Sequence, residues 1–187
     1  MAELKFEDEI LIPKARVAVL IGTKGAVKKK IEHTGHCRLK INKEGLVRIT
    51  ARDAFKLMIA KNVVEAIGRG FNPLIAQNLF KEDNGYELLN LYDYGAKKKS
   101  DMERMRGVVI GLEGSCRKVI EQITHVHMSV YGKTVALIGP HETLQKARQA
   151  VEMLLTGARH ATVYRFLEKK NNKAEQSSAS FTKVKNG

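Results

Sequence analysis

Two short glycine loops with the same spacing are the residues best suited to chemistry. Gly22-Thr23-Lys24-Gly25 follows Ile21, and Gly111-Leu112-Glu113-Gly114 follows Ile110. Glycines let the main chain approach a ligand closely. The amide N–H groups of such a loop, with the N-terminus of a following helix, suit a phosphate. A lone G-x-x-G string is more often a tight turn between helices, but two copies in matching surroundings favour a phosphate contact made twice.

The segments around the loops match as well. Ile31-Glu32-His33 recurs as Ile120-Glu121-Gln122 at the same offset, and the string from His36 to Ile41 is echoed from His125 to Val130. Self-similarity at a fixed spacing indicates two copies of one structural module.

The apolar periodicity predicts the elements of the first module in the order β-α-α-β-β-α. We expect a strand, two helices around the loop, two strands joined at Gly45, and a closing helix that Asp53 could cap. Their ranges are Glu9–Pro13, Lys14–Ile21, Ala26–His33, Cys37–Ile41, Leu46–Thr50 and Arg52–Ile67.

The second module repeats this order. Its expected ranges are Leu88–Tyr94, Met102–Ile110, Ser115–Gln122, His125–Val130, Thr134–Ile138 and His141–Leu155. Between the modules we expect an amphipathic segment, Pro73–Phe80, and a turn at Asp83-Asn84-Gly85. The connection is too apolar for a free linker, so the modules should pack together.

These elements divide the chain into three parts. We expect a first domain with its connecting helix at residues 5–82, a second domain with a C-terminal extension at 83–168, and a disordered basic tail at 169–187. In the extension, Val163, Tyr164, Phe166 and Leu167 are available to dock on the second domain.

Composition restricts the partners. The 187 residues are 43% hydrophobic and carry a net charge of +13, which implies a polyanionic partner because each phosphate contact releases condensed counterions. No apolar run approaches the ~20 residues that span a bilayer, so we expect no membrane. Cys37 and Cys116 fall at corresponding points of the two modules, which favours packing positions in a reduced, cytoplasmic protein.

A groove for bases should lie beside each loop. Apolar residues before the loop would form one wall and an edge strand the other: Leu20, Ile21, Val109 and Ile110, then Leu39, Ile41, Met128 and Val130. Besides the eight loop residues, the expected nucleic-acid contacts are Lys28, Lys29, Arg38, Lys40, Arg104, Arg106, Arg117, Lys118 and Lys133. A solvated helix face accounts for the lysine run about equally well. Glu113 would repel a nearby phosphate.

Other chemistry finds little support. His33, His36 and Cys37 lie close in sequence, but with no fourth ligand nearby a zinc site is not expected. The chain has no Walker loop, no G-x-S-x-G and no Cys-His pair with a third partner. We therefore expect neither catalysis nor a cofactor.

The order of elements and the loop resemble the type I K homology (KH) domain, whose G-x-x-G loop clamps four nucleotides of single-stranded nucleic acid. Three strings resemble more narrowly the archaeal tandem-KH ribosome-biogenesis factors, relatives of the eukaryotic pre-ribosomal protein called Partner of Nob One. These strings are Arg69–Pro73, Ser129–Val135 and Thr162–Glu168, and the resemblance covers roughly residues 5–170.

This resemblance implies an α+β fold of two tandem type I KH domains, each with a three-stranded sheet on helices, and a short C-terminal helical extension. It implies binding to single-stranded small-subunit rRNA near its 3′ end in a pre-ribosomal particle, with a maturation endonuclease and the α subunit of translation initiation factor 2 as candidate partners. It implies that the second domain grips the RNA, although the first loop, with Lys24, is better suited to a phosphate than the second, with Glu113. The rival reading is a protein-interaction scaffold that binds RNA weakly, or not at all, in one unit.

Overall fold

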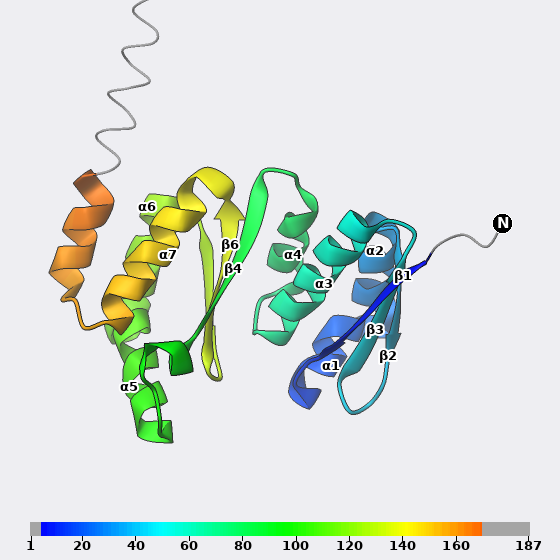
Figure 1. Cartoon of the computed structure of the whole chain (residues 1–187), viewed down its shortest axis with the longest axis horizontal. Helices are drawn as coiled ribbons and strands as arrows, with labels where there is room; N and C mark the ends of the chain where they lie inside the picture. Colours follow the sequence, from blue (N-terminus) through cyan, green and yellow to red (C-terminus); the bar gives the residue numbers. More distant parts are fainter. Residues whose placement is uncertain (1–4, 170–187) are drawn as a thin grey trace, which may run out of the picture.

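Each half of the chain forms a three-stranded antiparallel sheet packed on helices, in a computed structural model that describes residues 5–169 (Figure 1). The first domain has strand order β1-β3-β2. Its elements are β1 (Phe6–Leu11), α1 (Lys14–Ile21), α2 (Ala26–Thr34), β2 (Cys37–Ile41), β3 (Leu46–Ala51) and α3 (Ala54–Gly68). The β-α-α-β-β-α order is therefore confirmed. So is the cap of α3, because the Asp53 side chain accepts the Lys56 N–H at 2.9 Å.

The second domain has strand order β4-β6-β5. A short connection, α4 (Pro73–Ala76) and a 3-10 turn at Gln77–Phe80, leads into it. Its elements are β4 (Asn84–Asn90), a 3-10 turn (Leu91–Tyr94), α5 (Lys99–Ile110), α6 (Ser115–Thr124), β5 (His127–Tyr131), β6 (Thr134–Pro140) and α7 (His141–Leu155). Two type I KH folds, as expected, make up the described chain.

The first strand of each domain was predicted too far along the chain. Instead of Glu9–Pro13, β1 begins at Phe6, because Glu7 and Glu9 hide the alternation while pairing with β3. The predicted turn at Asp83-Asn84-Gly85 lies slightly earlier, where the Asn84 N–H donates to the Lys81 carbonyl at 3.1 Å, and Asn84 and Gly85 themselves lie within β4.

The predicted strand Leu88–Tyr94 is shifted likewise. β4 ends at Asn90, whose side chain accepts the Tyr92 N–H at 3.3 Å and starts a 3-10 turn. An Asn-Gly pair usually signals a hairpin. Here Gly85 serves close packing instead, because a Cβ on it would lie 2.7 Å from His141 and Leu144.

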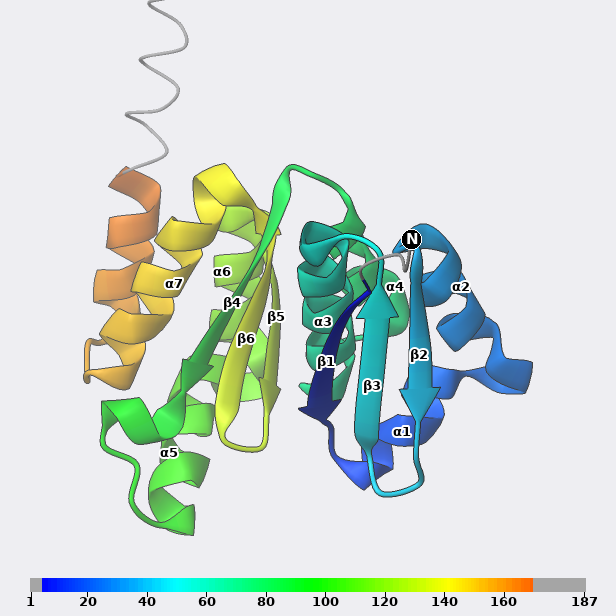
Figure 2. The same ribbon diagram turned by 45° about the vertical axis from the view of Figure 1, so that its right-hand side comes forward.

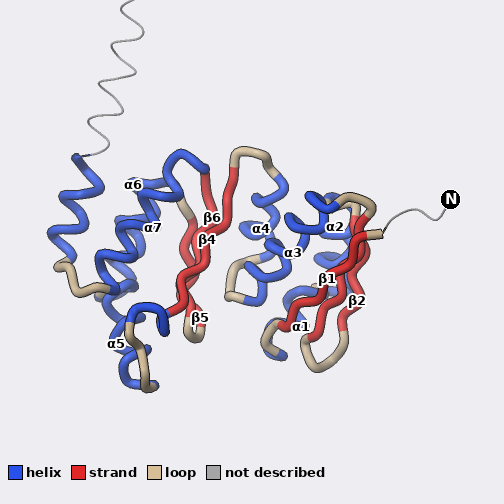
Figure 3. The backbone as a smooth tube through the Cα atoms, in the orientation of Figure 1, coloured by secondary structure: helices blue, strands red, loops and turns tan. Residues whose placement is uncertain are grey.

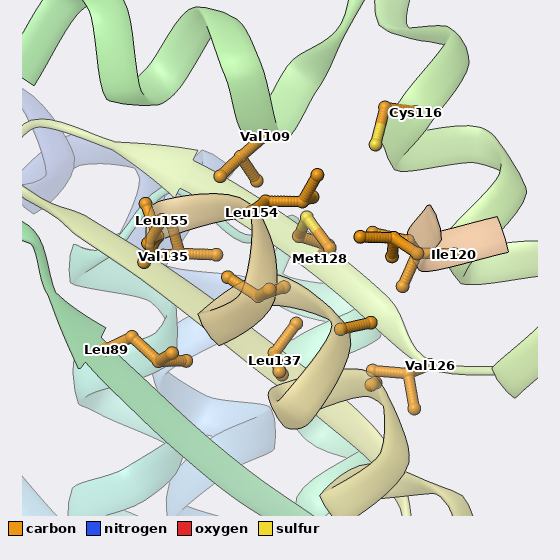
Figure 4. Close-up of a cluster of buried hydrophobic side chains, with 14 of the residues drawn as sticks. Leu89, Val109, Cys116, Ile120, Val126, Met128, Val135, Leu137, Leu154 and Leu155 are labelled. Atoms are coloured by element: carbon orange, nitrogen blue, oxygen red, sulfur yellow. The ribbon is translucent and has the colours of Figure 1, made fainter. Parts of the chain in front are cut away.

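The central strand β6 is buried on both faces. Val135 and Leu137 point into the core of the second domain with α5, α6 and α7 (Figure 4). Ala136 and Ile138 point the other way and belong to the core of the first domain. The second sheet therefore lies between its own helices and those of the first domain (Figure 3). The expectation that the two modules pack together is confirmed.

Polar contacts reinforce this interface. Ser129 Oγ donates to the Arg69 carbonyl at 2.8 Å, and a Cβ on Gly70 would lie 3.1 Å from Tyr131. Within the first domain, the Arg16 guanidinium on α1 donates to the carbonyls of Ile67 and Phe71, each at 2.7 Å, which fixes the end of α3 and the start of the connection. Two of the strings that carry the family resemblance therefore meet at the domain interface.

The C-terminal extension docks as expected. Residues 160–169 are helical, and Val163 and Leu167 are buried in the second core with Tyr164 and Phe166 packed around them. The His160 ring lies 2.7 Å from the Val108 carbonyl. The predicted disordered tail lies, from residue 170 on, outside the described residues.

One ion pair joins β1 to α3 and gives a pH-dependent prediction. Lys61 Nζ lies 2.6 Å from Asp8 Oδ2, and the hydrogen bond from this ammonium holds the pKa of Asp8 below its usual value. A lowered folded-state pKa contributes stability above the unfolded pKa and loses it as the pH falls.

Asp8→Asn should lower the free energy of unfolding by less than about 1 kcal/mol at neutral pH, because the pair is partly exposed. The deficit should shrink as the pH falls from about 4 toward 2. Urea titrations at several pH values measure it. Asp93→Asn, an exposed carboxylate with no ion pair among the described residues, is the control. An equal loss at every pH would contradict the prediction.

Candidate nucleic-acid interface

The two G-x-x-G loops have the same backbone conformation. Gly22 has φ 71° and ψ 172°, and Gly111 has φ 74° and ψ 174°, a region essentially reserved for glycine. The residues at the tips, Lys24 and Glu113, both adopt a left-handed conformation, with φ of 52° and 51°. Lys24 and Glu113 therefore occupy equivalent positions, and both are exposed.

The loops present their interior side chains to solvent. Thr23 and Lys24 are exposed, and Leu112 is 86% exposed, which is high for a leucine. An apolar tip of this kind can lie against a sugar or a base, while the charge at the second loop must come from its surroundings.

Each loop has a lysine beside its last glycine. The Lys29 Cε lies 4.0 Å from the place of a Cβ on Gly25, and the Lys118 Cε lies 3.9 Å from that on Gly114. Lys118 thus supplies a positive charge at the loop that carries Glu113. In the described structure, no side chain caps the start of α2 or α6, so their first N–H groups face the loop region.

In each domain, one glutamate on the helix after the loop bonds that helix to the edge strand. Glu32 Oε1 accepts the Leu39 N–H at 2.8 Å, and Glu121 Oε1 accepts the Met128 N–H at 2.7 Å. Sequence reasoning did not assign these residues a role. The available signal was their recurrence at the same offset in both modules.

The same glutamates pair with two of the predicted RNA contacts. Lys28 Nζ lies 4.0 Å from Glu32, and Arg117 Nε lies 3.3 Å from Glu121. Lys28 and Arg117 therefore lie beside the glutamates that join helix and edge strand, and these carboxylates balance part of their charge.

The predicted groove walls need correction. Leu20, Leu39, Val109 and Met128 are core residues with at most 2% exposure, because they lie on the inward faces of their helices and strands. Their neighbours Ile21, Ile41, Ile110 and Val130 keep part of their surface exposed. These four residues remain the apolar surface beside the loops.

The other predicted contacts are scattered. Arg38 and Lys40 alternate with buried residues on β2 and are exposed, and Arg38 shares a surface hollow with Lys29 of α2. Arg104 and Arg106 lie on α5, exposed and half-buried. Lys133, at the hairpin where Gly132 has φ 57°, lies 5.3 Å from the centre of the Tyr92 ring. The structure does not bring these residues to one place.

The two cysteines lie in the cores of the two domains. Cys37 and Cys116 are both buried and free, in agreement with their predicted packing role. Burial raises the pKa of the Cys37 thiol to about 11 and also raises that of Cys116. Among residues 5–169, no three metal-ligating side chains lie close enough together to hold an ion, and His33, His36 and Cys37 are no exception. None of the helices in this range is long and apolar enough to cross a bilayer.

Known proteins share this architecture. A family model for the KH domain matches residues 7–66, and one for the eukaryotic type, KH-domain type I, matches residues 86–172. A KH domain-containing protein of Methanocaldococcus jannaschii is 47% identical over 173 residues, covering 90% of this chain and 76% of the relative.

Solved structures are similar over most of their length. Dim2p from Pyrococcus horikoshii is 41% identical with a TM-score of 0.81, covering 88% of this chain and 99% of that one. The Dim2p chain in a complex of a/eIF2alpha, Dim2p and rRNA from the same organism is 40% identical with a TM-score of 0.84, covering 92% and 97%. With both KH units matched and 41–47% identity over most of the chain, this chain belongs to the tandem KH-domain family of archaeal Dim2p, to which the eukaryotic Partner of Nob One is related.

Proposed function

We propose that this protein is a non-enzymatic RNA-binding factor of the cytoplasm, which grips single-stranded small-subunit rRNA near its 3′ end while the pre-rRNA matures. The observation that carries the proposal is the doubled loop, with one backbone conformation, a lysine beside its last glycine and an uncapped helix start behind it. Phosphates suit such a surface because backbone N–H groups and the helix dipole both favour negative charge.

The relatives support the choice of RNA and partners. The solved complex of the similar Dim2p contains rRNA and a/eIF2alpha. By this similarity, the α subunit of translation initiation factor 2 is the favoured protein partner in our proposal. The pre-ribosomal particle and the maturation endonuclease follow only from the family resemblance.

Reciprocal charge reversal at the two loop tips tests the proposal. Lys24→Glu should weaken binding of a single-stranded oligonucleotide from the 3′ region of small-subunit rRNA about tenfold. It should also reduce the slope of log K against log salt by about 0.7, the value for one phosphate contact on a single strand. Glu113→Lys, at the equivalent position, should strengthen binding several-fold and steepen the slope.

Fluorescence anisotropy at several fixed salt concentrations gives both quantities. Both tips are exposed and keep their left-handed backbone, so circular dichroism should show unchanged folding. Unchanged affinity in both variants would eliminate the loop mechanism.

A protein-interaction scaffold is the second candidate, favoured by Glu113 at the tip of the second loop. Pull-downs of the α subunit of initiation factor 2 before and after nuclease treatment separate the two functions. Recovery that survives nuclease, together with absent RNA affinity, would establish the scaffold instead.

A further inference from the structure

A positively charged hollow of about 800 Å³ opens at the end of α2 that is remote from the loop. Its cationic lining comes from separate segments: Lys5, Lys29, Arg38, Arg52 and Lys56. Only two carboxylates, Glu32 and Asp53, line it, and both already accept backbone N–H groups, from Leu39 and Lys56. Polyanion binding is the chemistry that such a surplus of positive charge favours.

The hollow continues the surface of the first loop. Lys29 belongs to both, since its Cε stands beside Gly25 and the residue also lines the hollow. The nine residues of α2 span about 13 Å between these places. The residues that line the hollow lie where α2 ends, β2 begins and α3 begins, and these element ends meet at the upper end of the first domain in Figure 2. A nucleic-acid strand that followed α2 from the loop would reach the hollow.

An apolar pocket of about 520 Å³ adjoins the hollow, because His36 and Lys56 line both. It extends to the domain interface, where Tyr86 and His141 of the second domain close it. Phe55, which is 61% exposed, and Met58, which is 50% exposed, stand on its α3 side, and Phe80 stands opposite on the connection. Exposed aromatic faces beside a cationic groove are the usual platform for unpaired bases.

We propose that RNA bound along the first loop continues past α2, with a backbone phosphate in the hollow and an adjoining base on Phe55 in the pocket. This inference rests on the proposed function and extends the RNA footprint of the first domain beyond the loop. The adjacency of phosphate-binding and base-stacking surfaces matches the structure of one nucleotide. An acidic peptide would not need the continuity with Lys29 and the loop.

Two single substitutions test it. Lys56→Glu and Phe55→Ala change exposed side chains on the first turn of α3. Each should weaken an rRNA 3′-region oligonucleotide of about twelve nucleotides about tenfold, and leave one of about five nucleotides, enough for the loop alone, unchanged. Lys99→Glu, at a 90% exposed lysine on α5, and Leu74→Ala, at an exposed leucine on α4, are the controls.

The outcomes are separable. If both oligonucleotides weaken equally, or neither weakens, the extended path is overturned. Unchanged RNA affinity together with lost binding of the initiation factor α subunit would assign the pocket to a protein and also overturn it. If Lys24→Glu and Glu113→Lys leave both oligonucleotides unaffected while these α3 variants weaken the long one, the loop mechanism fails instead.

Discussion

Ile138→Ala is expected to lower the free energy of unfolding by about 2–5 kcal/mol, the cost of a cavity at a fully buried site. Ile138 lies on β6 of the second domain, but its side chain is part of the core of the first. The loss should therefore reach both domains, and α3 and α4 should exchange their amide hydrogens faster than in the unchanged protein.

Leu137→Ala is the matched control, since the neighbouring residue is equally buried but faces the second domain's own helices. It should destabilise by a similar amount and leave exchange in α3 less affected at equal stability. Urea denaturation gives the free energies, and hydrogen exchange gives their distribution. Identical exchange patterns for the two variants would show that the shared core does not couple the domains.

Gly111→Ala is expected to reduce stability by about 3 kcal/mol and to remove RNA binding by the second loop. The glycine has a backbone conformation that costs other residues about 1–3 kcal/mol. An added Cβ would also lie 2.7 Å from both the N and the Cβ of Cys116, at the start of α6. The loop must move, and with it the N–H groups that would face a phosphate.

Gly114→Ala separates the two causes. This glycine is in the ordinary left-handed region, with φ 77° and ψ 13°, and its Cβ would meet only the tip of Lys118 at 3.9 Å. The expected cost is about 1–2 kcal/mol, with folding and binding largely retained. Thermal unfolding and anisotropy on both variants decide the matter. Equal effects at the two glycines would contradict the role given to close packing at Gly111.

Most of the fold could be predicted from local features of the sequence. The ranges Lys14–Ile21, Cys37–Ile41 and His141–Leu155 were predicted to the residue, because turns or a change of periodicity bounded each one. The first strands were misplaced for one reason in both domains. Edge strands such as β1 and β4 are recognised by pairing with a distant strand, and Glu7 or Asn84 looks like a solvent residue or a turn until that partner is known.

The candidate site was predictable where it is local and not where it depends on packing. The loops and the lysines after them could be read directly from the sequence. Arg38 and Lys40 were predicted as RNA contacts, but on β2 they alternate with buried residues, and Arg38 lines the hollow. The hollow could not be predicted, because Lys29, Arg52 and Lys56 come together only once the sheet and α3 are assembled.

The outer sheet face of the first domain limits the length of this architecture. In the second domain the equivalent face is apolar and covered, whereas here Arg48 pairs with Glu7 at 3.2 Å and with Glu9 at 2.7 Å in solvent. A third module stacked there would bury these charges at a cost that its contacts would have to offset. With helix 160–169 covering the opposite end, the described chain resembles a repeat array closed by caps at both ends, and a polar outer face is what terminates such arrays. Stacking a further module on this face would first require replacing these charged residues with apolar ones.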